Sequence, residues 1–492
     1  MELFQPNEVS FREIERLKSL SPKNYARVDI YNKNKVPLSI FLDSQNPYSK
    51  GIEPGAFTYV DKSIVKFTRN SCINETSMIN IPQKNICLNP NYGFTNQLQE
   101  YDILLCKDAN IGQSCLFIPQ PKTISCFSSG IVKLNIKEEC LKFFILAFIR
   151  DDYFQTQLDL ATPRGSTIRH AGDRFLDCLI PSPSMLTSDQ LELFEILIKN
   201  IAHAELESEN KVQRSCEIFD KELYNQNYKY KEPNISSLES IGRIDAGYFS
   251  EEVSQLFYNV LNLKSGYKTL HDFGFTIKRG PNLAKRDLGR SIKRDIYKAN
   301  YHLLVYPSDI SDSGYITKKV YLGARNEVWY LKNGDILFSA EGSIGKTFAI
   351  CSEELKFTTN FHGIIITPKT KKTSLSNSIF LTLYLIYLRR KGILDKISVG
   401  GQGGSFAVGY WENFKIPVFT NKVNDEMEVL YHSKMELNPF TFSLSNIKKA
   451  GIFELNAFRI LCEDILKMII VDIKASSMKE ISLYKKILEK KK

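Results

Sequence analysis

Hydrophobic residues follow two alternating patterns along this chain of 492 residues. Across 1–183 and again across 233–419 they come in short runs separated by Asn, Pro and Gly, a pattern typical of strands joined by turns. At 187–224 and at 451–492 they recur instead at helical spacing. The chain is therefore expected to alternate between module and helix, twice over.

The first long helix is the most regular of these segments. From 187 to 224 there is neither Pro nor Gly, and Thr187 and Gln190 have the spacing of a helix N-terminal capping box. Its apolar residues have the spacing of a coiled-coil seam; they are Leu191, Phe194, Ile198, Ile201, Val212, Phe219 and Leu223. At 1.5 Å per residue the helix would be roughly 57 Å long. We expect a spacer whose apolar seam binds a partner.

These patterns predict four regions and an α+β fold. The regions are a first module at 1–183, a spacer helix and linker at 184–232, a second module at 233–419 and a helical region at 420–492. The two mixed α/β modules are similar, and the two long helices that separate them are expected to be antiparallel.

Shorter elements are predicted inside the modules. Leu38–Phe41 and Ala56–Val60 have strand-like composition, and Lys137–Leu160 and Ser376–Lys391 are helical in pattern. The buried side of the 137–160 helix is expected to hold Phe143, Phe144, Ile145, Ala147 and Phe148.

One stretch occurs twice, which indicates that the second module duplicates the first. Asp102-Ile103-Leu104-Leu105 leads to Gly112, and Asp335-Ile336-Leu337-Phe338 leads to Gly345, at a numbering offset of 233 (345 − 112). Gly130 and Gly363 have the same offset, whereas that of Gly165-Ser166 and Gly404-Ser405 is 239 (404 − 165). Each half then closes on an apolar run that ends in proline, at Pro181 and at Pro417. Two copies of one module that differ in the length of a loop are expected to keep one numbering offset before that loop and a different one after it.

The second copy imitates a phosphate-binding loop. Ala340–Thr347 (AEGSIGKT) fits the loose motif, but the motif requires a helix directly after it. Here an apolar, strand-like run follows, Phe348-Ala349-Ile350-Cys351, and the first copy has Gln113-Ser114 in place of Lys346-Thr347. We interpret both copies as β-hairpins, with a nucleotide-dependent enzyme using Lys346 as the alternative.

The charge suggests an anionic partner. The net charge is +10 and the pI about 8.9. Basic residues are dense between 278 and 298, where the alternative is an ordinary solvated helical face over 284–298. The candidate DNA-binding residues of the second module are Lys278, Arg279, Lys285, Arg286, Arg290, Lys293, Arg294, Lys346, Gln402 and Ser405, and those of the first are Arg69, Lys107, Arg164 and Arg169.

Other features of the sequence limit the possible functions. The ten cysteines include no C-x-x-C pair and are expected to be reduced, buried thiols of a cytoplasmic protein. No apolar run approaches the ~20 residues of a membrane span. The six histidines lack metal-ligand spacing; His170 and His362 lie beside the repeated glycines, either as DNA contacts or as ordinary loop residues. No adenine-methyltransferase tetrapeptide is present, and Asp335 with Glu354-Leu355-Lys356 is a chance nuclease-like triplet. We expect no catalytic residues.

The repeated order of motifs resembles the specificity (S) subunit of type I restriction–modification systems. The resemblance is carried by Gly334–Phe338 with Gly345, by Tyr101–Leu105 with Gly112, by the Arg243–Phe249 segment (RIDAGYF) and by the two Gly-Ser pairs with their Ile-Pro endings. In the first module only Arg27-Val28-Asp29 faintly echoes the RIDAGYF segment.

The resemblance implies a non-catalytic subunit with two target-recognition domains. Each would read half of a bipartite double-stranded DNA site, with the helices binding methyltransferase subunits, two being expected. It implies no cofactor on this chain: S-adenosylmethionine, ATP and Mg would belong to partner subunits. Restriction or translocase subunits are further partners that it allows, in defence against foreign DNA. A free-standing DNA-binding protein without a methyltransferase remains a second alternative.

Overall fold

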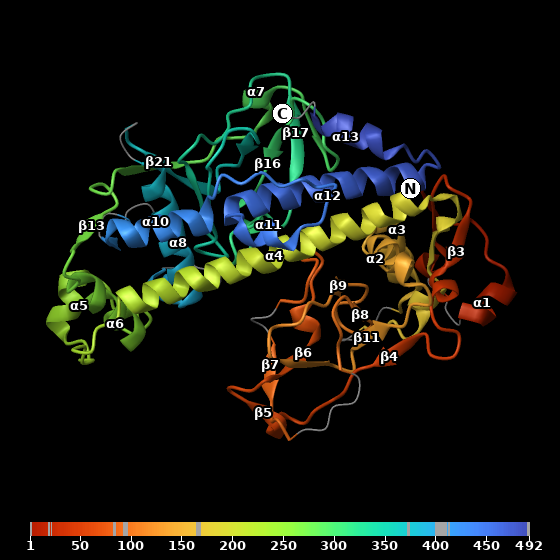
Figure 1. Ribbon diagram of the computed structural model, residues 1–492, viewed down its shortest axis with the longest axis horizontal. Coiled ribbons are helices and arrows are strands. Elements are labelled where there is room, and N and C mark those ends of the chain that lie inside the picture. Colours follow the sequence, from red (N-terminus) through yellow and green to blue (C-terminus); the bar gives the residue numbers. More distant parts are fainter. Residues whose placement is uncertain are drawn as a thin grey trace. The chain divides into compact units, whose positions relative to one another are not determined.

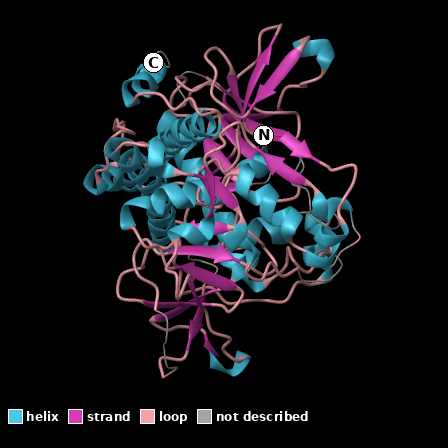
Figure 2. Ribbon diagram, turned by 90° about the vertical axis from the view of Figure 1, so that its right-hand side faces the viewer, coloured by secondary structure: helices cyan, strands magenta, loops and turns pink. Residues whose placement is uncertain are grey.

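The computed structural model describes residues 2–17, 20, 22–81, 85–91, 97–163, 169–370, 374–398, 411 and 414–489. The chain divides into two compact units (Figure 1). Unit 1 comprises Met1–Ala202, Pro439–Phe442 and Leu461–Lys490, and unit 2 is built mainly from His203–Asn438 and Ser443–Ile460. Helices and strands both contribute to the structure, which confirms the α+β class (Figure 2).

Unit 1 contains two four-stranded sheets. The first has the order β4-β11-β8-β9 and is antiparallel; its strands are β4 (Tyr48–Lys50), β11 (Ile131–Leu134), β8 (Ile103–Cys106) and β9 (Ser114–Leu116). The second has the order β10-β6-β7-β5, with β10 parallel to β6; its strands are β10 (Ile124–Phe127), β6 (Val65–Thr68), β7 (Ile86–Leu88) and β5 (Tyr59–Val60). Two short pairs complete the unit: β12 (Leu179–Pro181) with β3 (Lys35–Pro37), and β1 (Glu2–Phe4) with β2 (Arg27–Asp29).

Unit 2 repeats the topology of the first of these sheets and again contains a second mixed sheet. Its first sheet has the order β14-β21-β18-β19, formed by β14 (Phe275–Arg279), β21 (Gly363–Pro368), β18 (Ile336–Ser339) and β19 (Thr347–Ala349). Its second has the order β15-β17-β16-β20, with β16 parallel to β20, formed by β15 (Ser291–Arg294), β17 (Val320–Ala324), β16 (His302–Leu304) and β20 (Phe357–Thr358). The Ile-Pro ending again forms a short pair, β22 (Lys415–Pro417) with β13 (Tyr267–Thr269).

The duplication extends to individual backbone hydrogen bonds. In the first hairpin the N–H of Gly112 donates to Cys106 O at 2.9 Å, and in the second the N–H of Gly345 donates to Ser339 O at 2.8 Å. Gly112 and Gly345 have φ of 81° and 87°, in the left-handed region where glycine has no Cβ penalty. The predicted pair of equivalent β-hairpins is confirmed.

The strands that pair with β8 and β18 on the other side, β11 and β21, differ in numbering offset from the hairpins. Cys106 pairs with Ile131, whereas its equivalent Ser339 pairs with Gly363. The numbering offset in this strand is therefore smaller by one than the offset of the hairpin glycines, so Gly130 and Gly363 are not structurally equivalent. The pairing itself is the same in both units, so the connection before β21 is one residue shorter than the connection before β11.

The two long helices are α4 (Ser188–Glu222) and α12 (Ile452–Lys474), packed side by side (Figure 1). Gln190 bonds to Lys479 beyond the end of α12, whereas Glu205 bonds to Arg459 near its start, so the two helices run in opposite directions. The predicted capping box is present: Gln190 N donates to Thr187 Oγ1 at 3.3 Å and Thr187 N to Gln190 Oε1 at 3.0 Å.

Three predicted elements differ in detail. The C-terminal helix stops at Lys474 because Ser476 adopts φ of 54°, and α13 (Ile481–Glu489) follows. The 137–160 helix is divided into α2 (Lys142–Ile149) and α3 (Asp152–Ala161), since Asp151 caps a new helix by accepting from Tyr153 N at 3.0 Å. Leu38–Phe41 is a 3-10 turn and not a strand.

Two further helices follow the hairpin-bearing sheet in each unit. In unit 2, α8 (Leu375–Arg390) and α9 (Ile393–Ile397) occupy the chain positions of α2 and α3. The five residues expected on the buried side of the 137–160 helix are all buried. The other helices are α1 (Phe11–Leu17), α5 (Ile235–Ile241), α6 (Glu251–Leu261), α7 (Lys285–Leu288), α10 (Asn421–Tyr431) and α11 (Leu444–Lys449).

The apolar seam of α4 is occupied by this chain itself, which contradicts its predicted role in partner binding. Phe194 contacts Phe144 with ring centroids 5.4 Å apart, and Phe219 contacts Phe380 at 5.6 Å. Ile198, Ile201, Val212 and Leu223 are equally buried, and only Leu191 is partly exposed. Heptad-like spacing is satisfied by packing within each unit, so these six side chains are not available to another subunit.

Buried ion pairs hold the helices against the sheets of unit 2. Arg459, 1% exposed, donates from Nε to Glu205 at 2.8 Å, and its guanidinium also bonds to Ile316 O. Arg390 from α8 makes a bidentate pair with Glu209 of α4 at 2.8 and 2.5 Å. Breaking a pair so deeply buried would leave an uncompensated charge, so these contacts fix the sheets on the helices.

Candidate nucleic-acid interface

An exposed stretch of basic residues runs along one margin of unit 2, from β14 to β15. We call it the basic edge; its members are Lys278, Arg279, Lys285, Arg286, Arg290, Lys293 and Arg294, all exposed. The chain leaves β14, forms the single turn α7, reverses at Gly289 (φ 66°) and returns as β15. Because β15 is the outer strand of its sheet, all four of its residues are exposed.

Few of these charges are held by strong internal pairs. Lys293 Nζ lies 3.0 Å from the hydroxyl of Tyr306, Arg279 lies 3.3 Å from Glu341, and Lys278 lies 4.9 Å from the ring centroid of Trp329. Within the described ranges, Lys285, Arg290 and Arg294 form no ion pair. Such a row of exposed cations can bind phosphate oxygens without breaking contacts that hold the fold together.

The equivalent margin of unit 1 is different in chemistry. The residues between β4 and β6 form a 3-10 turn at Ala56–Thr58 and the short strand β5. Phe57 is 90% exposed there and Ile64 is 55% exposed, and the nearby charges have both signs, as in Asp61 and Lys62. The two units therefore present a cationic margin in unit 2 and a largely neutral one in unit 1.

The candidates of unit 1 are dispersed. Arg69 is exposed just after β6, and Lys107 lies on the first hairpin, 3.3 Å from Asp108. Arg169 is engaged internally, with its guanidinium 2.8 Å from Asp159 and 3.4 Å from Thr162 O. Arg164, Gln402 and Ser405 lie outside the described residues.

Lys346 does not have the surroundings of a phosphate-loop lysine, which contradicts the nucleotide alternative. Its Nζ donates to Ser308 O at 2.9 Å, and burial lowers its pKa. Thr347 begins the strand β19 where the motif requires a helix, and its hydroxyl is buried and donates to Gly345 O at 2.8 Å. No nest of N–H groups at a helix N-terminus is formed by the described residues of this hairpin.

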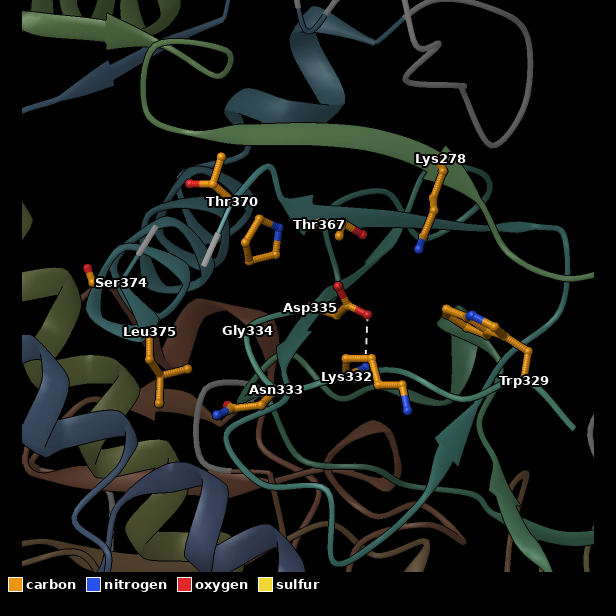
Figure 3. A pocket seen from close by; sticks show the side chains of 11 residues that line it. Lys278, Trp329, Lys332, Asn333, Gly334, Asp335, Thr367, Thr370, Ser374 and Leu375 are labelled. Atoms are coloured by element: carbon orange, nitrogen blue, oxygen red, sulfur yellow. Dashed lines mark hydrogen bonds between the residues drawn. The ribbon is translucent and has the colours of Figure 1, made fainter. Parts of the chain in front are cut away.

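A hollow of about 490 Å³ lies beside the start of the second hairpin (Figure 3). Lys278, Trp329 and Asp335 line it, together with Ser374 and Leu375 at the start of α8. Asp335 is 2% exposed; burial raises its pKa, and its carboxylate accepts from Lys332 N at 2.9 Å.

Asp335 has a structural role that the first module repeats. Its equivalent Asp102 accepts in the same way from Gln99 N at 2.7 Å. Both carboxylates therefore close the turn that begins the hairpin, which explains why the aspartate recurs. The presence of Asp335 is thus explained without a nuclease-like site formed with Glu354 and Lys356.

The RIDAGYF segment also has a structural role. Arg243 bonds to Asp245 through two nitrogens at 2.8 and 2.7 Å and donates to Ile397 O, at the end of α9, at 2.8 Å. A cation at a helix C-terminus is favourable. Arg27 in unit 1 instead lies on β2, largely exposed, beside Glu13, so the faint sequence echo does not mark an equivalent position.

Metal and membrane signals are lacking in what the structure describes. Among those residues no three His, Cys, Asp or Glu side chains gather closely enough to bind a metal ion. No helix formed by them combines the length and apolarity of a membrane span. Nine of the ten cysteines are buried and Cys140 is exposed.

Two copies of one α+β module with two long antiparallel helices define the architectural class of this protein. Three solved structures match most of the chain. The type I restriction–modification S subunit from M. genitalium is 12% identical, covers 94% of this chain and 99% of its own, and has a TM-score of 0.37. The HsdS subunit from Thermoanaerobacter tengcongensis is 13% identical, with coverages of 93% and 95% and a TM-score of 0.25.

A third structure describes complex assembly and conformational transition of the type I restriction–modification system. It is 14% identical, covers 90% of this chain and 96% of its own, and has a TM-score of 0.26. No family model and no curated protein sequence matches this chain.

Proposed function

We propose that this chain is a non-catalytic, sequence-specific DNA-binding subunit that reads a bipartite site, one half with each unit. The observation that carries the proposal is the duplication itself. The hairpin-bearing sheets of the two units share strand order, and their hairpins share backbone hydrogen bonds at equivalent glycines. A duplicated reader suits duplex DNA, whose half-sites are presented by a repeating helix.

The basic edge supports nucleic acid as the ligand of unit 2. Seven exposed cations follow β14, α7 and β15, and the whole chain carries a net charge of +10. Phosphate contacts of this kind provide affinity and position a protein on the duplex without specifying sequence. Sequence would be read by side chains beside the edge.

The long helices are proposed to hold methyltransferase subunits, of which the family resemblance implies two. Because the apolar seam of α4 is filled from within, such partners would contact its outer face, which includes Gln213, Arg214, Glu217 and Lys221. S-adenosylmethionine, ATP and Mg would be bound by partner subunits in the cytoplasm, and restriction or translocase subunits would join through them. A free-standing DNA-binding protein is the alternative, which co-purification from the host distinguishes.

Methylation mapping in cells tests the proposal. Cells that carry this chain and its methyltransferase subunits should show methylated adenines within a motif of two short blocks. Replacing residues 233–419 with the second module of another such subunit should change one block and preserve the other. If both blocks survived the exchange, or if methylation did not depend on this chain, the proposal would be wrong.

A further inference from the structure

Both units carry a histidine paired with a carboxylate at the tip of the repeated hairpin. In unit 1, His170 Nδ1 lies 2.7 Å from Asp108 Oδ1. In unit 2, His362 Nδ1 lies 3.4 Å from Glu341 Oε2. Asp108 and Glu341 have the same numbering offset as Gly112 and Gly345, so they occupy the same position of the duplicated hairpin.

The two histidines reach these carboxylates from different segments. His170 follows α3 and forms a β-bridge with Asp108, whereas His362 directly precedes β21. Duplication alone therefore explains the acids but not the histidines. The same pair of groups has been assembled twice by different routes, which indicates a shared requirement at the tip.

A basic residue stands at the same end of the sheet in each unit. Lys50, the last residue of β4, pairs with Val132, and Arg279, the last residue of β14, pairs with Ile364; these are equivalent rungs of the two ladders. In each sheet the hairpin tip follows β8 or β18 at that same end, one strand further on, beyond β11 or β21. At the tips themselves, Lys107 Nζ lies 3.3 Å from Asp108 Oδ2 and Arg279 Nη1 lies 3.3 Å from Glu341 Oε1, so a cation, a carboxylate and an imidazole meet in each unit.

The tips are accessible and held in place. The side chains of His170, His362 and Glu341 are 63%, 53% and 46% exposed, and that of Asp108 is 20% exposed. The N–H of Ala109 bonds to Arg169 O at 3.1 Å in the first tip. In the second, the ring of Phe361, itself 51% exposed, lies 3.9 Å from that of His362.

Stability does not account for these pairs. Exposed ion pairs contribute only about 0–1 kcal/mol, and a carboxylate close to DNA is repelled by phosphates. Asp and Glu are useful at base edges because they accept from the amino groups of cytosine or adenine. A carboxylate also holds the imidazole through Nδ1, which leaves Nε2 for another partner.

We propose that the two acid–histidine tips, Asp108 with His170 and Glu341 with His362, are the base-reading positions of the two units. Each tip faces base edges in the major groove, where its carboxylate selects a base that presents an amino group. This inference rests on the proposed DNA-reading function and assigns the reading to particular side chains. The basic edge supplies affinity, and the tips supply sequence preference.

Selection from a randomised duplex DNA library by the purified full-length chain, followed by sequencing, tests the assignment. The variants are Glu341→Gln and His362→Ala in unit 2, and Asp108→Asn and His170→Ala in unit 1. Glu353→Gln is the matched control, because Glu353 is an exposed acid of unit 2 that follows β19 at the opposite end of the hairpin.

We expect the two unit 2 variants to relax base preference within one half-site by at least about fivefold, the low end for a good base contact. The other half-site should be unchanged. The unit 1 variants should do the reverse, and the control should keep both half-sites.

Two results would overturn the assignment while leaving DNA reading intact: all four variants keep the wild-type motif, or they weaken binding equally at every position. Thermal unfolding identifies any alanine variant that does not fold, in which case the near-isosteric Glu341→Gln and Asp108→Asn decide. A wild-type chain that selects no two-block motif would instead contradict the proposed function itself.

Discussion

Removing charge from the basic edge should change the salt dependence of DNA binding by a calculable amount. Lys285, Arg290 and Arg294 are exposed, and replacing all three with alanine removes up to three phosphate contacts. Each contact contributes about 0.9 to the slope of log K against log salt concentration. The triple variant should therefore have a slope smaller by about 2.7, so that the change in affinity between 50 mM and 200 mM salt is about 40-fold smaller than for wild type.

Fluorescence anisotropy with a labelled duplex over this salt range measures the slope. The matched control replaces Lys422, Lys448 and Lys449, three exposed lysines of unit 2 on α10 and α11, and loses the same net charge. If only the overall charge of the protein mattered, the slope of log K against log salt concentration would decrease by the same amount in both triple variants. An edge variant with the wild-type slope would show that these residues do not contact phosphates.

Four further outcomes follow from individual contacts. In calorimetry neither the wild type nor Lys346→Ala should bind nucleotide above background, and the substitution should weaken DNA binding by less than the triple edge variant does. If the wild type bound ATP and Lys346→Ala did not, the nucleotide alternative would be restored. Arg459→Met should destabilise the fold by about 3–5 kcal/mol in urea unfolding because it leaves Glu205 charged and buried, and adding Glu205→Leu should recover much of the loss; full stability in the single variant would contradict the buried pair. Burial alone would raise the pKa of Glu454, but hydrogen bonds from His432 and Ser433 N outweigh this effect and lower the pKa. The contribution of Glu454 to stability is therefore present at neutral pH. It is lost as the pH falls below the ordinary glutamate pKa of about 4.3. Glu454→Gln should flatten that acid limb of a stability–pH curve, and an unchanged limb would refute it. Native alkylation followed by mass spectrometry should modify Cys140 and spare the nine buried cysteines; rapid modification of Cys126, whose pKa burial raises to about 11, would show that its core opens.

The sequence was sufficient for the features that local chemistry determines. Glycine is required where the hairpin adopts positive φ, so Gly112 and Gly345 kept their spacing and revealed the duplication. The capping residues Thr187 and Gln190 likewise marked the start of α4. Both signals depend only on residues close in the chain.

Features that depend on distant packing were less accessible. The spacing of Phe194 and Phe219 is the same whether a helix contacts a partner or its own sheets, and only the structure shows that Phe144 and Phe380 fill that space. The position of His170 and His362 beside the repeated glycines was visible in the sequence, but their pairing with Asp108 and Glu341 was hidden for a related reason. His170 and His362 do not share the numbering offset of the duplicated hairpins, so no alignment of the two copies brings them together.

The most direct test of the central claim is the DNA sequence that the full-length wild-type chain selects from a randomised duplex library. Two units built on one repeated hairpin sheet predict two short conserved blocks separated by positions of no preference, each block altered by changes in only one unit. A single continuous block, or the absence of any enriched sequence, would contradict the account.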